Sequence, residues 1–470
     1  MALTSRTEAK RETVDPWRLT APGTLVLASM LCALLLILSW RALTPRTTSI
    51  VPITSAALGM PAGPSIAVLR FQGAPGDAAS KFLSDAIVEE IATRLTRFSE
   101  LRVIARPPVR EAGTSEVDEA GQEPAAQFLV KGSLRQGGER LRVTAQLIRA
   151  SDAKLLWAET YERQLTPTDI FDVEDDVANK IVAAVASISA GAIARETLGQ
   201  VRSKAPRDLS AYECIARANE IMNSGFSAAT HLSTRTCLET VLATEPDYAA
   251  AWAMLSWLHT LEFSYGYNKR TGSDPRERAM TAARRSVELA PDHCMSRFAM
   301  ARAAYLMGDL QQFYGEAAAA LKINPHDPFL LGNLGTWLSF TGRWEEGTAM
   351  VRKAIDLNPK VYPRWWHAAL GKDHYRKGEY TAALTEFKNM SLPNWWWNQV
   401  ELAYTYGQLA DGENALAAVT RLLELYPSFD LDKAVMEHRK FSFEQSYIDL
   451  AVDGLRKAGV PEKAGRTAKR

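Results

Sequence analysis

The sequence predicts a small α/β domain followed by an all-α solenoid, preceded by a single transmembrane helix. Three observations support this fold class. Residues 19–40 carry no charged side chain, residues 65–190 alternate strand-like and helix-like segments, and five prolines follow one another at a spacing of 34 residues. With 470 residues, of which 47% are hydrophobic, the chain is long enough to form more than one hydrophobic core.

The uncharged segment 19–40 is expected to cross a bacterial inner membrane once. As a helix it would be about 33 Å long, which is sufficient for a hydrocarbon layer of about 30 Å. Four basic residues lie in the tail 1–18, and only Arg41 and Arg46 follow the segment before Arg70. The positive-inside rule therefore predicts a cytoplasmic N-terminus and a periplasmic remainder. The alternative, a cleaved signal peptide, is disfavoured because the apolar run is long and no small-residue cleavage site follows it.

Residues 41–64 are rich in Thr, Ser, Ala, Pro and Gly without periodicity, so they are predicted to form a flexible linker. The α/β domain, residues 65–190, begins with a β-branched strand, a helix with apolar residues at helical spacing, and a second strand. Three alternating segments then follow, separated by short turns containing Gly or Asp, and they predict a β-meander. An amphipathic helix closes the domain.

The second half of the chain has a fixed period. Turn glycines lie between the prolines, so each unit is predicted to contain a helix, a Gly turn, a second helix and a Pro-marked turn. Such hairpins bury their apolar faces only by stacking on their neighbours, which predicts a solenoid. The prolines and glycines that define the period are Pro291, Pro325, Pro359, Pro393 and Pro427, and Gly308, Gly342, Gly378 and Gly412.

Residues 207–427 resemble tetratricopeptide (TPR) repeats. Large apolar residues stand six places after Pro246, Pro325 and Pro359, at Trp252, Leu331 and Trp365. Two departures are visible: "SYGYNKRTGSDP" interrupts the second unit, and the last two full units run 19 residues from Pro to Gly instead of 17. About six hairpins are expected, followed by capping helices at 428–460 and a basic tail at 461–470.

The segments "SIAVLRF", "FLVKGSLRQGGERLRV" and "DIFDVEDDVANKIVAAV" are similar to the TolB-type amino-terminal α/β domain. That domain occurs in CadC-like membrane activators and in multidomain adenylate cyclase relatives, where a cytoplasmic effector precedes the membrane helix and TPR-like helices follow. Only 18 residues precede the segment here, so no cytoplasmic effector is expected. The resemblance therefore implies architecture and compartment, and not a cyclase activity.

The sequence contains none of the common catalytic or nucleotide-binding motifs, which predicts a protein that is not an enzyme and has no cofactor. Seven scattered histidines and four cysteines without CxxC spacing give no metal site. A net charge of +1 gives no reason to expect nucleic acid as a partner. Cys214 and Cys237 lie at similar distances from the turn near Gly225, so they are expected either to form a disulfide or to be two small buried side chains.

The concave groove of the repeats is the candidate site, because the first helices of TPR hairpins line it and aromatic and Arg side chains commonly anchor partners. The sequence therefore predicts a periplasmic scaffold that binds a protein or peptide. The alternative is a sensory receptor subunit that binds a small ligand and signals to a separate adenylate cyclase or transcription regulator. Counting from each proline places the following residues toward the groove: Trp257, Arg302, Tyr305, Phe329, Trp366, His374, Trp397 and Tyr404.

Overall fold

The computed structural model describes residues 63–73, 78–104, 126–165, 170–188, 190–201, 204, 209–224 and 227–463. The predicted tail at 1–18, the predicted membrane helix at 19–40, nearly all of the predicted linker and the last seven residues lie outside this range. Among the described residues, no helix combines the length and the hydrophobicity needed to cross a bilayer.

The α/β domain is built on one five-stranded sheet with the order β2-β1-β3-β4-β5. β1 pairs in parallel with both β2 and β3, whereas β3, β4 and β5 form an antiparallel meander. This is the predicted β-α-β start followed by a meander. The strands are β1 (Ser65–Val68), β2 (Arg102–Ile104), β3 (Phe128–Gly137), β4 (Arg140–Arg149) and β5 (Lys154–Gln164).

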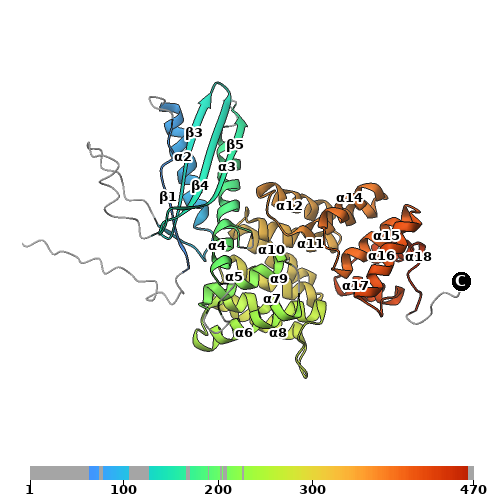
Figure 1. The fold of residues 1–470 in the computed structure, drawn as a ribbon. Helices are drawn as coiled ribbons and strands as arrows, with labels where there is room; N and C mark the ends of the chain where they lie inside the picture. The colour runs from blue at the N-terminus through green and yellow to red at the C-terminus, as the bar shows by residue number, and fades with distance from the viewer. Residues whose placement is uncertain are drawn as a thin grey trace, which may run out of the picture. The chain divides into compact units, whose positions relative to one another are not determined.

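Two helices, α2 (Ala78–Leu95) and α3 (Ile170–Ala186), pack against each other and against this sheet (Figure 1). Their apolar residues recur at helical spacing, so one side of each helix is buried with alternate residues of the strands. Ile87, Ile91 and Val177 share one hydrophobic core with Val143 and Leu147 of β4.

The helical region begins with α4 (Ala192–Val201), and six successive helical hairpins follow it in the part of the chain that the structure describes. This confirms the predicted solenoid. The loop 266–274 between α7 and α8 holds most of the predicted interruption. The hairpins are α5 (Ala211–Ser224) with α6 (Ala228–Thr244), α7 (Ala249–Tyr265) with α8 (Pro275–Leu289), α9 (Cys294–Met307) with α10 (Leu310–Ile323), α11 (Pro328–Phe340) with α12 (Trp344–Leu357), α13 (His367–Arg376) with α14 (Tyr380–Met390), and α15 (Trp396–Gln408) with α16 (Gly412–Leu425).

Local chemistry fixes the ends of these helices. Five aspartates cap the N-termini of α8, α10, α11, α16 and α17 (Leu431–Lys440), each accepting a hydrogen bond from a backbone N–H two or three residues further on. Three of the predicted turn glycines adopt positive φ, at Gly308, Gly342 and Gly378. The fourth does not: Gly412 starts α16, and Ala410 takes the left-handed conformation instead, with φ of 55°.

The C-terminal segment forms α17 (Leu431–Lys440) and α18 (Gln445–Lys457), which lie beside the last hairpin (Figure 1). These helices were expected to cap the end of the solenoid. The segment that joins them also contacts earlier hairpins. The Tyr305 hydroxyl on α9 donates a hydrogen bond to the carbonyl of Phe441. The rings of Phe340 and Phe443 stack with their centroids 4.4 Å apart.

Candidate binding site on the inner face of the solenoid

The first helices of the hairpins, α7, α9, α11, α13 and α15, together form a surface that we call the inner face. A cavity of about 70 Å³, called here the inner cavity, receives side chains from all five helices. Phe441 and Phe443, which connect α17 to α18, cover it. The inner cavity is lined by Trp257, Leu261, Tyr265, Arg302, Asn333, Trp337, Phe340, Trp365, Ala368, Lys372, Trp395, Trp397, Glu401, Phe441 and Phe443.

Three of the eight residues predicted to face the groove, Trp257, Arg302 and Trp397, line the inner cavity. Tyr305 and Tyr404 lie under the C-terminal helices, where the Tyr404 hydroxyl oxygen is 2.9 Å from that of Tyr447. All five of these residues are buried. The inner face is thus partly occupied by the chain's own C-terminal segment, which the repeat pattern does not reveal.

The remaining three predicted residues do not line the inner cavity. Phe329 packs against Phe298 with ring centroids 4.9 Å apart. His374 is partly exposed, and its Nδ1 is 2.5 Å from the Glu379 carboxylate. Trp366 is only 1% exposed and packs so closely on α11 that a Cβ added at Gly332 would lie 2.2 Å from its ring.

Trp366 is placed differently because its unit contains two extra residues between proline and glycine. The extra length lies before the first helix, where η4 (Arg364–Trp366) precedes α13. A shift of two residues rotates a helical position by about 200°. Corrected for this shift, Lys372 occupies the place in its hairpin that Trp257 and Arg302 occupy in theirs, and it does line the inner cavity.

Arg302 is a buried cation without a carboxylate partner among the described residues. Arg302 is 5% exposed, and its Nε and Nη1 atoms have no hydrogen-bond acceptor in the described part of the chain. The Nη2 atom lies 3.5 Å from the Ser264 hydroxyl, and the guanidinium carbon is 4.3 Å from the Trp337 ring centroid. Burial lowers the pKa of Arg302 to about 10, so the guanidinium remains charged at neutral pH.

Lys372 and Glu401 form a buried ion pair on the same lining. Burial lowers the pKa of Lys372 and raises the pKa of Glu401, and their mutual attraction opposes both shifts. With or without proton transfer between them, the pair contributes no net charge. Lys372 Nζ is also 5.4–5.9 Å from the ring centroids of Phe340, Phe387, Trp397 and Phe443. Arg302 is therefore the uncompensated charge of the inner cavity.

A larger depression of about 1010 Å³, called here the outer groove, adjoins the inner cavity and shares Tyr265, Trp365 and Trp395 with it. Aromatic rings form much of its wall, with basic residues at the rim. It is lined by Ser227, Thr230, Phe263, Ser264, Tyr265, Gly266, Tyr267, Lys269, Arg364, Trp365, Met390, Ser391, Leu392, Pro393, Asn394, Trp395, Trp396, Leu425, Tyr426, Glu437 and Lys440.

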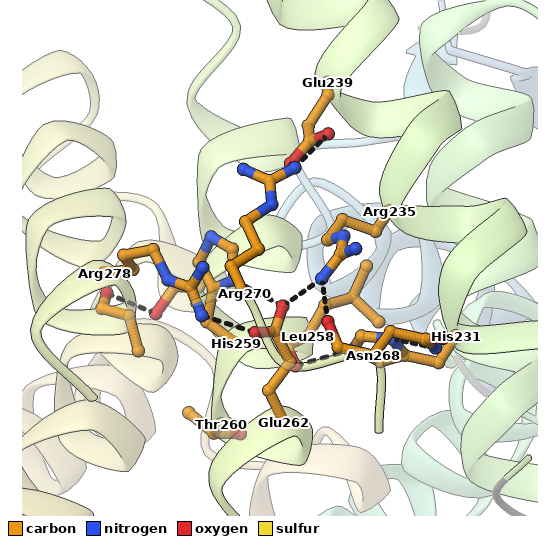
Figure 2. A network of polar contacts seen from close by, with 12 residues as sticks. His231, Arg235, Glu239, Leu258, His259, Thr260, Glu262, Asn268, Arg270 and Arg278 are labelled. Atoms are coloured by element: carbon orange, nitrogen blue, oxygen red, sulfur yellow. Dashed lines mark hydrogen bonds and ion pairs between the residues drawn. The ribbon is translucent and has the colours of Figure 1, made fainter. Parts of the chain in front are cut away.

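A polar network centred on Glu262 holds one wall of the outer groove in place (Figure 2). The Glu262 carboxylate is fully buried and accepts a 2.5 Å hydrogen bond from Arg235 Nη1 and a further bond from Arg278. Its Oε1 lies 3.1 Å from His259 Nδ1, and these partners lower the pKa of Glu262 to about 2 against the opposing effect of burial.

The same network reaches the loop 266–274. Arg235 Nη1 also donates to the carbonyl of Asn268 at 2.9 Å, and the Asn268 amide donates to the carbonyl of Ala228 at 2.6 Å. Gly266, Tyr267 and Lys269 of this loop line the outer groove. The interruption of the repeat pattern at this point therefore builds part of the groove.

Sequence reasoning missed Lys372, Glu401, Trp365 and Trp395 as lining residues. Lys372 and Glu401 could have been found, because charged residues at buried helix positions are rare and commonly come in pairs. Trp395 precedes its helix and Trp365 lies in η4, and helix periodicity gives no information about either position.

Fold and site together define a protein with a small α/β domain, followed by a solenoid of TPR-type hairpins whose inner face is aromatic. No protein-family model matches the chain. A putative adenylate cyclase 3 from Rhizobium meliloti (strain 1021) is 35% identical over 216 residues, which make up 45% of this chain and 35% of that protein. The chain thus spans about a third of the length of this curated relative.

Three solved structures are similar to parts of the chain. The APC/C hetero-tetramer Cut9-Hcn1 shares 13% identity over 62% of this chain and 56% of its own, with a TM-score of 0.40. YrrB, a TPR protein with an unusual peptide-binding site, shares 16% identity over 40% and 92%, with a TM-score of 0.27. TolB from Acinetobacter baumannii shares 17% identity over 25% and 27%, with a TM-score of 0.18. Likenesses at this level do not indicate what this chain binds.

Proposed function

We propose that this protein is a membrane-anchored periplasmic scaffold that binds an extended segment of a partner protein in the outer groove. The observation that carries the proposal is the groove itself, about 1010 Å³ in volume. Its half-buried aromatic rings include Tyr265 of α7, Trp395 before α15 and Tyr426 directly after α16. Rings of this kind bury a large area at low entropic cost and commonly anchor protein partners.

The charge of the outer groove favours a partner segment that carries acidic residues. Lys269, Arg364 and Lys440 lie on its lining with one carboxylate, Glu437. Lys440 Nζ is 3.1 Å from the Glu437 carboxylate and 2.9 Å from the carbonyl of Ser264, so these two charges offset each other. Lys269 and Arg364 leave the rim positive, which favours an acidic segment with apolar side chains.

The proposed compartment rests on the apolar segment 19–40 and on the disulfide that the structure contains between Cys214 and Cys237. Structural disulfides are typical of oxidising compartments such as the periplasm.

A photo-crosslinking amino acid at Lys269 tests the partner proposal in the full chain in its native host. A specific protein adduct is expected at position 269 and not at Arg284, an exposed residue of α8 away from the groove. Trp395→Ala should abolish the adduct because it removes a central ring of the groove. The proposal fails if positions 269 and 284 give the same adducts, or if Trp395→Ala leaves the adduct unchanged.

A second candidate function is a receptor subunit that binds a small ligand and signals to a separate cyclase or regulator. The inner cavity favours it, because a site of about 70 Å³ suits a small molecule better than a chain segment. The similarity of 45% of the chain to a protein named as a putative adenylate cyclase also supports a signalling role. Deletion of the gene would then change cyclic AMP levels or the transcription of a target regulator's genes, whereas a scaffold would change neither.

A further inference from the structure

The inner cavity has the features of a ligand site of its own, although it adjoins the partner-binding outer groove and shares three residues with it. It is lined by aromatic rings and carries one uncompensated buried cation. A buried charge without a partner is costly, and proteins commonly pair such charges or use them to bind a ligand. Arg302 has two nitrogen atoms, Nε and Nη1, whose N–H groups no described residue accepts.

Further unsatisfied hydrogen-bond donors lie on the same lining. The indole Nε1 atoms of Trp365 and Trp395 are buried and have no acceptor among the described residues. One unsatisfied acceptor is also present, Oε2 of Glu401, whose other oxygen binds Lys372. Since the Lys372–Glu401 pair is neutral as a whole, the lining favours a ligand with negative charge and acceptor oxygens.

The size of the cavity limits the ligand. A volume of about 70 Å³ exceeds what one water molecule needs, but it is too small for a folded segment of a partner. The ring walls formed by Trp257, Trp337 and Phe443 suit an apolar body. We propose that the inner cavity binds a short-chain organic acid, whose carboxylate accepts hydrogen bonds from the Arg302 guanidinium while its alkyl part packs against these rings.

Propionate and propionamide provide the test, because they have nearly the same size and shape and differ in charge. Binding to the purified full chain is measured by the shift of the melting temperature and by calorimetry, in a buffer without carboxylates. Propionate should bind at least about tenfold more tightly than propionamide, since hydrogen bonds to charged groups contribute roughly this much. Equal binding of the two compounds, or no binding of either, would overturn the proposal without any variant.

Arg302→Met keeps much of the side-chain volume and removes the charge. It should weaken propionate binding at least about tenfold and leave propionamide unaffected, whereas the matched variant Arg284→Met on the exposed face of α8 should bind propionate as the native chain does. Without ligand, Arg302→Met should melt no lower than the native protein, because it removes a buried unpaired charge. Unchanged propionate binding by Arg302→Met would refute the proposal. Loss of propionate binding leaves the crosslinking result at Lys269 unaffected, so the two proposals are tested separately.

Discussion

Glu262 and Arg302 are two buried charges on neighbouring first helices, and their surroundings differ. The carboxylate of Glu262 is surrounded by Arg235, His259 and Arg278, whereas Arg302 has aromatic rings and one distant hydroxyl. Removing a buried charge that has a full set of partners destabilises the fold, whereas a buried charge without partners lowers stability until a ligand supplies the counter-charge. The first residue is therefore structural, and the second is the candidate for binding.

Glu262→Gln is expected to lower the free energy of unfolding by about 3 kcal/mol, because it leaves two buried guanidinium groups without their counter-charge. Chemical denaturation at pH 7 measures this loss. The control is Glu239→Gln on α6, which removes a partly exposed pair with Arg270 in the same neighbourhood. That change should cost less than about 1 kcal/mol. Equal losses for the two variants would contradict the central role assigned to Glu262.

The pH dependence of stability gives a second readout of the same carboxylate. Its pKa falls from 4.5 to about 2 on folding, so the stabilisation is fully present above pH 4.5 and is lost as the pH falls toward 2. Between these values the native chain should lose stability more steeply than Glu262→Gln, which has no carboxylate to protonate. Parallel curves for the two proteins, obtained from denaturation at several pH values, would show that the Glu262 pKa is not depressed.

Trp366 was predicted to face the groove, and its position in the structure changes the expected result of its removal. Trp366→Ala should destabilise the protein by about 3 to 5 kcal/mol, because the ring fills space between η4 and Gly332 of α11. Trp395→Ala in the half-buried wall of the outer groove is the matched control and should change the melting temperature little. A Trp366→Ala variant with native stability would show that Trp366 is not a core residue, and it would again be a candidate for partner binding.

At the scale of single elements, the disulfide between Cys214 and Cys237 joins α5 to α6, with the two Cα atoms 5.8 Å apart. It closes a loop between residues 23 positions apart in the sequence, and its loss is expected to cost about 3 kcal/mol. The variant Cys214→Ser with Cys237→Ser should therefore melt lower than the native chain. Reduction should lower the native protein to the level of the variant, and mass spectrometry of unreduced peptides should find the two cysteines linked. Two free thiols in protein isolated from its host would contradict the bond.

The helical hairpins could be predicted from sequence because the residues that begin and end each helix act locally. A proline, an Asp cap or a glycine acts within a few residues, so Pro328 with Asp327 marks the start of α11 without any tertiary information. The same reasoning missed the turn before α16, since Ala410 adopts the left-handed conformation that a glycine was expected to provide. It predicted capping helices at 428–460 but not their contacts with earlier hairpins, because contacts such as that between Phe340 and Phe443 join residues far apart in the chain.

The candidate site was only partly predictable for the same reason. Counting from the prolines identified Trp257, Arg302 and Trp397, of which only Arg302 lies in a unit of regular length. It failed for Trp366, where two additional residues rotate the helix, and it gave no information on Phe441 or Phe443, which lie outside the repeats. A pattern of fixed period therefore predicts which residues share a face, but not which other segment of the chain covers that face.

At the scale of the whole molecule, the predicted orientation in the membrane remains to be tested. A reporter that is active only in the periplasm should work when fused after residue 64, and a reporter that is active only in the cytoplasm should not. The physical reason is the excess of basic residues on the N-terminal side of the segment 19–40. The opposite reporter pattern would reverse the proposed compartment and would also remove the environment in which the disulfide is expected to form.

The hydrogen bond from Tyr305 to Phe441 joins residues 136 positions apart. In an ordinary repeat array each hairpin touches only its neighbours, so the terminal units open first and the array unravels stepwise. Here the last helices are fastened to the middle of the array, and opening them breaks contacts with α9, α11 and α15 at once. Amide hydrogens in α15 and α18 should therefore exchange with solvent as slowly as those in α9, in one cooperative step. The last hairpins of this protein are thus expected to unfold together with the middle of the array and not before it.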